Sequence, residues 1–303
     1  MTLSTEDAFS KFRSRLELND REQKNASGRQ REIRAHMDEE FAIDEDFLTG
    51  SYARHTKTKP LKDVDIFCVL GQAERHYRQK SPSELLGAVE SALAKKYGSS
   101  CVKQQRRSVT VEFGVEADDE DKTNYRVVSF DVVPAFALDS NYEIPDKGNA
   151  AAGGWTKSNP RIHSEKAVDA QKAYSNEWKG LVRMMKYWNN HHSKPVRPSF
   201  LLEVMALDVL HPPYGGDRAR EMQFFFAAIA GRIGETWNDP AGLGPPVSDT
   251  MDVASCSAAK RALWEAERDA AQAIYLTRQG RQSDALKGWR TLFGPLFPLS
   301  SAS

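Results

Sequence analysis

The chain has 303 residues, 40% of them hydrophobic, so it is long enough to form one two-lobed enzyme or two modest domains that each bury a core. This composition excludes a disordered chain. Lysine plus arginine and aspartate plus glutamate both total 42, so the overall charge gives no sign of a surface that holds long nucleic acid, and we expect no such partner.

The cysteines and the hydropathy pattern narrow the class of protein further. Cys68, Cys101 and Cys256 are far apart and form no CxxC pair, which argues against a disulfide framework and against a cysteine zinc site. The N-terminus is charged and has no apolar signal region, and no later stretch approaches the roughly 18 apolar residues of a membrane span. We therefore expect a cytoplasmic protein with no membrane partner.

The first half of the chain changes from a helical pattern to a strand pattern. Residues 6–41 contain no proline and place apolar residues at helical intervals, which predicts either one long amphipathic helix or a broken pair. The segments 63–70 (DVDIFCVL), 108–116 (SVTVEFGVE) and 125–138 (YRVVSFDVVPAFAL) are rich in β-branched and aromatic residues and predict strands. Between them, residues 81–98 predict a helix that ends at a glycine.

The second half of the chain is predicted to be helical. Residues 146–160 are dense in glycine, asparagine and small residues, which is typical of a loop between lobes. Beyond this loop the strand signal disappears, and four helical stretches are predicted near 165–192, 199–211, 218–236 and 254–290.

Two carboxylates, Asp63 and Asp65, stand two residues apart at the start of an apolar strand. The two-residue period of a strand sends both side chains to the same face. Two like charges this close need a cation, and an oxygen-only site of this kind suits Mg²⁺ or Mn²⁺.

A third carboxylate, Asp131, interrupts the apolar segment VVSFDVVPAF. If its strand neighbours that of Asp63 and Asp65, at a spacing of roughly 4.8 Å, Asp131 completes the cluster. Three carboxylates can hold two metal ions, one activating an attacking hydroxyl and the other steadying a leaving pyrophosphate. Glu112 and Glu116 are the alternatives for the third ligand.

Gly50 and Ser51 precede the acidic pair, and a glycine followed by a small hydroxyl residue lets backbone N–H groups approach phosphate oxygens. A lone DxD is more often a surface turn or an edge charge. Together with the upstream GS and the downstream FDV in apolar strands, the DVD favours a metal-assisted phosphoryl-transfer site.

This pattern of GS, an interval, DVD and a later strand Asp resembles the polymerase-β-like nucleotidyltransferase superfamily. Within it, the chain is similar to the CD-NTases, bacterial relatives of cGAMP synthase and oligoadenylate synthetase that make cyclic di- and trinucleotides for antiphage signalling. The most specific part is GSYARHTKTKPLKDVDIFCVL, because the GS to DVD spacing and the threonines and lysines between them both look like the family.

The resemblance implies an α+β fold: a polymerase-β-like palm with a small mixed sheet, and a C-terminal helical domain, with the active site in the cleft between them. We expect the palm, with a long N-terminal helix, at residues 1–155 and the helical nucleotide-binding domain at 156–303. The implied site is a two-ion Mg²⁺ site, with Mn²⁺ as the alternative metal, in which Asp63, Asp65 and Asp131 are both catalytic residues and metal ligands.

The helical half adds a second match. Residues 178–192 (WKGLVRMMKYWNNHH) place large apolar side chains on one helical face and Lys179, Arg183 and Lys186 on another. With VRPSFLLEVMALDVL, this segment resembles the paired helices of the oligoadenylate synthetase C-terminal domain. By that resemblance Lys186 and Ser199 contact the triphosphate, Arg183 assists, and Phe200 stacks on a base, although a basic helix face is often only solvated and such a phenylalanine is often core.

The implied reaction joins nucleoside triphosphates, ATP among them, into a cyclic di- or trinucleotide second messenger with release of pyrophosphate, in bacterial antiphage (CBASS) signalling. A regulatory protein and an effector that responds to the product are the further partners expected. Two alternatives remain open: a linear oligoadenylate synthetase or RNA-directed transferase of the same superfamily, and a catalytically silent nucleotide-binding regulator.

Overall fold

The computed structural model describes residues 3–18, 20–59, 61–114, 129–149 and 153–300. These residues fall into two compact units, which we call the sheet unit and the helical unit. The sheet unit comprises residues 18–164 and 241–244, and the helical unit comprises residues 1–17, 165–240 and 245–303. The predicted α+β class is confirmed. The predicted division at 155/156 stays a prediction, while the compact units change over at 164/165 and place the first helix in the helical unit.

The sheet unit is built on one mixed sheet, which within the described residues has seven strands in the order β1-β2-β5-β4-β3, with β6 pairing β5 and β7 pairing β6. β2 and β5 are parallel, and the other pairs are antiparallel. The strands are β1 (Ile43–Thr49), β2 (Asp63–Leu70), β3 (Val102–Gln104), β4 (Val109–Glu112), β5 (Ser129–Leu138), β6 (Asn141–Pro145) and β7 (Trp155–Ser158).

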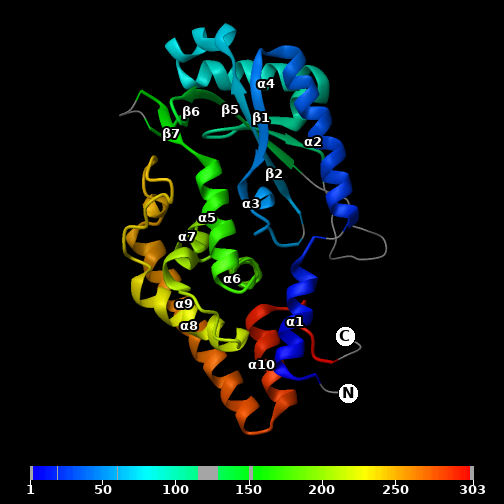
Figure 1. Ribbon diagram of the computed structural model, residues 1–303, viewed down its shortest axis with the longest axis vertical. Helices are drawn as coiled ribbons and strands as arrows, with labels where there is room; N and C mark the ends of the chain where they lie inside the picture. The colour runs from blue at the N-terminus through cyan, green and yellow to red at the C-terminus, as the bar shows by residue number, and fades with distance from the viewer. Residues whose placement is uncertain (1–2, 19, 60, 115–128, 150–152, 301–303) are drawn as a thin grey trace. The chain divides into compact units, whose positions relative to one another are not determined.

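One face of this sheet is covered by the helices α2 (Asp20–Glu40) and α4 (Pro82–Tyr97), and Figure 1 shows both helices beside the strands. Val64, Ile66 and Val132 point into this layer and are fully buried. The opposite face carries the alternate residues of the same strands. There a smaller apolar cluster around Phe67 and the three predicted carboxylates lie along the strands.

Helix α4 begins and ends where its sequence predicts. The Glu84 carboxylate accepts a hydrogen bond from the backbone N–H of Ser81 at 3.0 Å, which satisfies a donor at the start of the helix. At the other end Gly98 adopts a φ of +87°, a conformation that glycine takes without strain. The predicted helix over 81–98 is confirmed.

The helical unit encloses its own core of aromatic and aliphatic side chains, among them Trp178, Trp188 and Trp289, each at most 1% exposed. Its first helix, α1, packs Phe9 and Phe12 into that core. The helices are α1 (Thr5–Leu16), α5 (Pro160–Ala173), which begins in the sheet unit, α6 (Trp178–His191), α7 (Ser199–Val209), α8 (Arg218–Arg232), α9 (Val253–Arg278) and α10 (Gln282–Phe293).

Several predicted boundaries are wrong for local reasons. The stretch 165–192 divides between α5 and α6 because Ser175 and Asn176 adopt positive φ angles, 53° and 63°. The stretch 254–290 divides between α9 and α10 at Gly280, with φ +73°. Of the two readings of residues 6–41, the structure has the broken pair, α1 and α2.

The predicted loop 146–160 contains a strand. β7 pairs with β6 from Pro145↔Trp155 to Tyr142↔Ser158, and Trp155 is only 4% exposed. The glycines and small residues that precede Trp155 hide this short strand in the sequence. The strand forms because β6 supplies its pairing partner, which the composition of the segment does not show. Within the described ranges, no helix is both long and apolar enough to cross a membrane.

Candidate active site

The sheet register brings two of the three predicted carboxylates directly side by side. β2 and β5 are adjacent parallel strands, and Asp65 pairs with Asp131 in their register. Asp63 lies two residues before Asp65 and therefore on the same face. The predicted cluster of three carboxylates on neighbouring strands is thus present in the backbone arrangement.

Threonines extend this row on both sides. Thr49 of β1 pairs with Asp65, and Thr110 of β4 pairs with Asp131. Both threonines are less than 10% exposed. The Thr110 hydroxyl donates a hydrogen bond to Oδ1 of Asp131, so β4 fixes the orientation of that carboxylate.

Gly50 supports the cluster through its lack of a side chain. It adopts a φ of +67°, and a Cβ atom at this position would lie 1.7 Å from Oδ2 of Asp65. Any other residue would therefore displace the carboxylate or the loop. Ser51 follows in the short helix α3 (Gly50–Ala53), and its carbonyl accepts the backbone N–H groups of Thr56 and Lys57 at 3.0 and 3.1 Å.

Lys57 is the cation that meets the acidic cluster. Its Nζ lies 2.5 Å from Oδ1 of Asp63, with the lysine side chain 16% exposed and the aspartate 43% exposed. With Asp63 turned to Lys57 and Asp131 turned to Thr110, no group of three or more His, Cys, Asp or Glu in the described part of the chain is arranged to hold a metal ion. The backbone places the carboxylates together, and protein donors hold the side chains of Asp63 and Asp131.

The crowding of negative charge shows in the pKa values of the cluster. The pKa of Asp65 is raised to about 7, first by burial and then by the charges of Asp63 and Asp131, while Lys57 and Arg54 partly offset the rise. Burial also raises the pKa of Asp131, and the hydrogen bond from Thr110 opposes this. A divalent cation would favour the ionised form of both carboxylates, so an all-oxygen donor set under this repulsion fits Mg²⁺ or Mn²⁺.

The predicted nucleotide contacts from the second half lie in the helical unit. The apolar face of α6 is confirmed, since Trp178, Met185 and Trp188 are at most 1% exposed. Two of the three basic residues named on the other face, Arg183 and Lys186, are buried, whereas Lys179 is partly exposed. Lys186 is 5% exposed and its Nζ lies 2.5 Å from Oε1 of Glu203, which is 1% exposed.

Arg183 is also buried and paired. Its Nη2 lies 2.6 Å from Oε1 of Glu17, at the end of α1. Ser199 begins α7 and is exposed. Phe200 is partly buried against the helical core. The roles of Lys186, Arg183, Ser199 and Phe200 toward a nucleotide stay predictions.

Of the two alternative third ligands, Glu112 is engaged elsewhere and Glu116 stays a prediction. Glu112 pairs opposite Ser129, and its carboxylate lies 3.0 Å from Nζ of Lys103. Glu116 lies outside the described residues. The residues that sequence reasoning missed are Lys57, Thr110 and Glu203. Thr110 had a detectable signal, because it is the polar residue of an alternating apolar strand.

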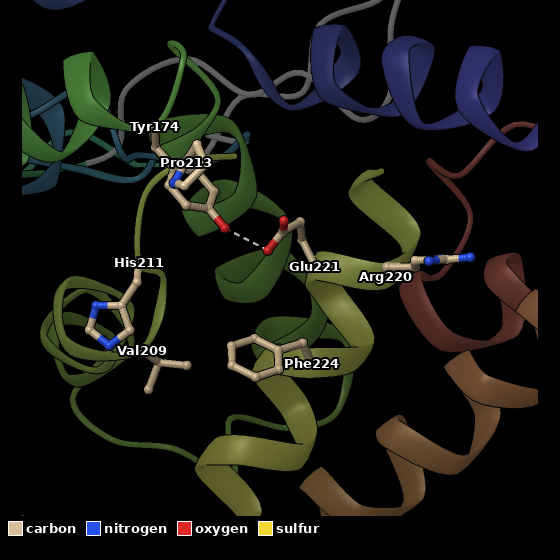
Figure 2. A pocket seen from close by; sticks show the side chains of 7 residues that line it. All are labelled: Tyr174, Val209, His211, Pro213, Arg220, Glu221 and Phe224. Atoms are coloured by element: carbon tan, nitrogen blue, oxygen red, sulfur yellow. Dashed lines mark hydrogen bonds between the residues drawn. The ribbon is translucent and has the colours of Figure 1, made fainter. Parts of the chain in front are cut away.

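A surface pocket of about 280 Å³ lies in the helical unit, and none of the predicted site residues lines it (Figure 2). In it the Tyr174 hydroxyl donates to Oε2 of Glu221 at 2.6 Å. The pocket is lined by Tyr174, Val209, His211, Pro213, Arg220, Glu221 and Phe224. Its single carboxylate is already engaged, so the pocket offers no metal site.

The sheet with its carboxylate row, together with a helical unit, has the fold of the polymerase-β-like nucleotidyltransferases. CdnC of E. coli, solved with ATP, has the same fold with a TM-score of 0.71 over 98% of this chain and 99% of that chain, at 17% identity. A second structure of CdnC, in complex with HORMA-deltaN, matches with a TM-score of 0.70 over 96% and 98% of the two chains, also at 17% identity.

A family model described as the Second Messenger Oligonucleotide or Dinucleotide Synthetase domain matches residues 1–170, and the chain belongs to this family, the CD-NTases. The chain is 27% identical over 274 residues to a "probable cyclic nucleotide synthase" of Bacillus cereus, covering 82% of this chain and 81% of that protein. It is also 27% identical over 276 residues to a cyclic AMP-AMP-AMP synthase of an Acinetobacter species, covering 84% and 73%. The predicted family and the predicted class of reaction are confirmed.

Proposed function

We propose that the protein condenses nucleoside triphosphates, ATP among them, into a cyclic di- or trinucleotide in a metal-dependent reaction. The observation that supports this most directly is the register of β2 and β5, which sets Asp65 beside Asp131 with Asp63 on the same face. The Acinetobacter relative, a cyclic AMP-AMP-AMP synthase, supports ATP as a substrate and a ring as the product.

In the proposed reaction a ribose 2′ or 3′ hydroxyl of one nucleotide attacks the α-phosphorus of another. A new phosphodiester oxygen–phosphorus bond forms, the bond between the α-phosphorus and the bridging oxygen breaks, and pyrophosphate leaves. Asp63, Asp65 and Asp131 would hold two Mg²⁺ or Mn²⁺ ions, which when bound supply charge stabilisation and hydroxyl activation. Thr110 holds Asp131 in place, and Gly50 leaves room for Asp65.

The test is incubation of the purified protein with all four radiolabelled nucleoside triphosphates and Mg²⁺ or Mn²⁺, then phosphatase, then mass spectrometry. A cyclic product has no terminal phosphate and survives phosphatase with its phosphates intact. Linear products that lose terminal phosphates would point instead to an oligoadenylate synthetase. No pyrophosphate release from any mixture, with the protein folded, would favour a silent nucleotide-binding regulator.

We also propose that the reaction serves bacterial antiphage signalling, in the cytoplasm, with a regulatory protein that controls synthesis and an effector that responds to the product. The complex of E. coli CdnC with HORMA-deltaN supports the regulatory partner. Co-purification of the full chain with a candidate regulator, and a change in product yield when the two are mixed, would test this part separately.

A further inference from the structure

Lys57 is placed among the carboxylates by the loop that leads into β2. The backbone N–H groups of Thr56 and Lys57 both bond to the Ser51 carbonyl, so the chain folds back directly after α3. This turn directs the Lys57 side chain toward Asp63, where Nζ and Oδ1 lie 2.5 Å apart. The ammonium is mostly buried, with 16% of the side chain exposed.

The charge of Lys57 acts on the whole cluster. Its Nζ contacts Oδ1 of Asp63, which shares one face of the sheet with Asp65 and Asp131. Three carboxylates on one face of a sheet repel one another, and an ammonium within contact distance stabilises their ionised forms. Lys57 therefore contributes part of the positive charge that a divalent metal would supply.

A metal ion and the Lys57 ammonium would compete for the carboxylate of Asp63. A cation bound at Oδ1 of Asp63 would be repelled by the ammonium that lies 2.5 Å from the same oxygen, so each weakens the binding of the other.

We propose that Lys57 is an internal counter-cation of the carboxylate cluster, which competes with the divalent metal for Asp63 and must leave it before the metal binds. This inference rests on the proposed use of Asp63, Asp65 and Asp131 as metal ligands. Lys57 thereby offsets part of the negative charge of the carboxylates and lowers their affinity for metal without nucleotide.

The test is calorimetric titration of the metal-free full-length protein with Mn²⁺ alone, with no nucleotide present. Lys57→Met removes the charge at similar volume, and we expect it to bind Mn²⁺ about tenfold more tightly than the wild type. Lys62→Met is the matched control, since it removes one positive charge from an exposed residue directly before β2. Its Mn²⁺ affinity should stay within about threefold of the wild type, because exposed charges are screened.

A second readout is the melting temperature in EDTA. Lys57→Met should melt at a lower temperature than Lys62→Met, because it removes the ammonium that contacts Asp63. Mn²⁺ should raise the melting temperature of Lys57→Met by more than it raises that of Lys62→Met. If Lys57→Met does not fold without metal, Lys57→Gln carries the same expectation, since it removes the charge and keeps a hydrogen-bond donor.

The outcomes separate this inference from the proposed function. Mn²⁺ binding that is lost in Asp63→Asn but unchanged or weaker in the Lys57 variants would overturn the role of Lys57 and leave the metal site standing. No Mn²⁺ binding by the wild type or by any variant would overturn the metal site itself, and the competition with it.

Discussion

The carboxylates of the sheet and the basic residues of helix α6 are both predicted to serve the nucleotide, yet their charges are compensated differently. Asp65 and Asp131 stand side by side as like charges, with Lys57 in contact only with Asp63. Lys186 instead has an acid partner, Glu203, and both are nearly inaccessible. The sheet therefore retains unbalanced negative charge, whereas the α6 charge is neutralised within the unit.

Clustered like charges and a buried ion pair differ in how strongly they indicate a ligand-binding site. Like charges forced together are unfavourable unless a ligand compensates them, so the sheet cluster points to a cation. A buried pair of opposite charges is compensated already and is weak evidence for either function or stability. The four predictions that follow test this comparison.

The largest effect is expected from the double change Asp63→Asn with Asp65→Asn. If the cluster holds the metals, product formation should fall by about 10³-fold or more, while the protein stays folded because mutual repulsion is removed. Asp169→Asn, at an exposed position of α5, is the control. Product yield and circular dichroism on the same preparations are the measurements. A folded double variant with near-normal yield would show that the cluster is structural.

Gly50→Ala tests the cluster without changing its charge. The new Cβ would meet Oδ2 of Asp65 at 1.7 Å, and a displacement of about 1 Å in a catalytic group corresponds to roughly 10² in rate. We expect kcat/KM to fall by about that factor. Gly28→Ala in α2 is the matched control, because its Cβ would meet nothing within 4 Å. Equal activity in the two variants would contradict a close packing of Gly50 against Asp65.

The sequence predicts the sheet cluster well because the rules involved are local and strict. The two-residue period fixes Asp63 and Asp65 on one face, and Asp131 completes the cluster once its apolar strand is taken as the neighbour of theirs. It does not reveal that Lys57 turns back onto Asp63, since that contact depends on the carbonyl of Ser51 accepting two N–H groups.

Helix α6 shows where the sequence stops being informative. Its period correctly identifies a core face, but a helix surrounded by α1, α7 and α8 has little solvent face left, and the neighbours come from distant parts of the chain. Glu203, seventeen residues after Lys186, becomes its partner only through the packing of α7 on α6. No pattern within 178–192 contains that information.

Lys186→Ala tests the buried Lys186–Glu203 ion pair of the helical unit. The change leaves the Glu203 carboxylate buried without its ammonium, so we expect a loss of about 3–5 kcal/mol in the free energy of unfolding. Lys186→Met with Glu203→Leu should recover most of it, since it removes both charges. Lys172→Ala, exposed on α5, is the control and should stay within about 0.5 kcal/mol. Chemical denaturation measures all of them.

The predicted triphosphate contact adds an activity readout to the same variants. A lysine on a β- or γ-phosphate contributes equally before and during the transition state, so Lys186→Ala should raise KM more than it lowers kcat, measured below its melting temperature. A collapsed kcat with an unchanged KM would show that Lys186 is not a triphosphate ligand.

The smallest expected effect is a pH dependence of the stability of the metal-free protein. It follows from the uncompensated negative charge of the sheet. Burial and the neighbouring carboxylates raise the pKa of Asp65 in the folded protein to about 7, above its ordinary value of 3.8, so over that interval the folded state holds a proton that the unfolded state has released. The resulting stabilisation is fully present below about pH 3.8 and is lost as the pH rises through about 7.

The side chain introduced by Asp65→Asn does not titrate. The difference between the wild type and this variant therefore isolates the contribution of Asp65 to the pH dependence of stability. In EDTA, the melting temperature of the wild type relative to Asp65→Asn should fall by a few degrees between pH 5 and pH 8. Adding Mn²⁺ should stabilise the wild type more at pH 8 than at pH 5, because the metal competes with the proton for the same carboxylate. The Lys186–Glu203 pair, in which each charge has its partner, gives no reason for a trend of this kind. If the difference in melting temperature between the wild type and Asp65→Asn does not change with pH, Lys57 and Arg54 compensate the charge of Asp65 fully. The carboxylates of the sheet and the charged residues of α6 would then differ in exposure and not in charge balance.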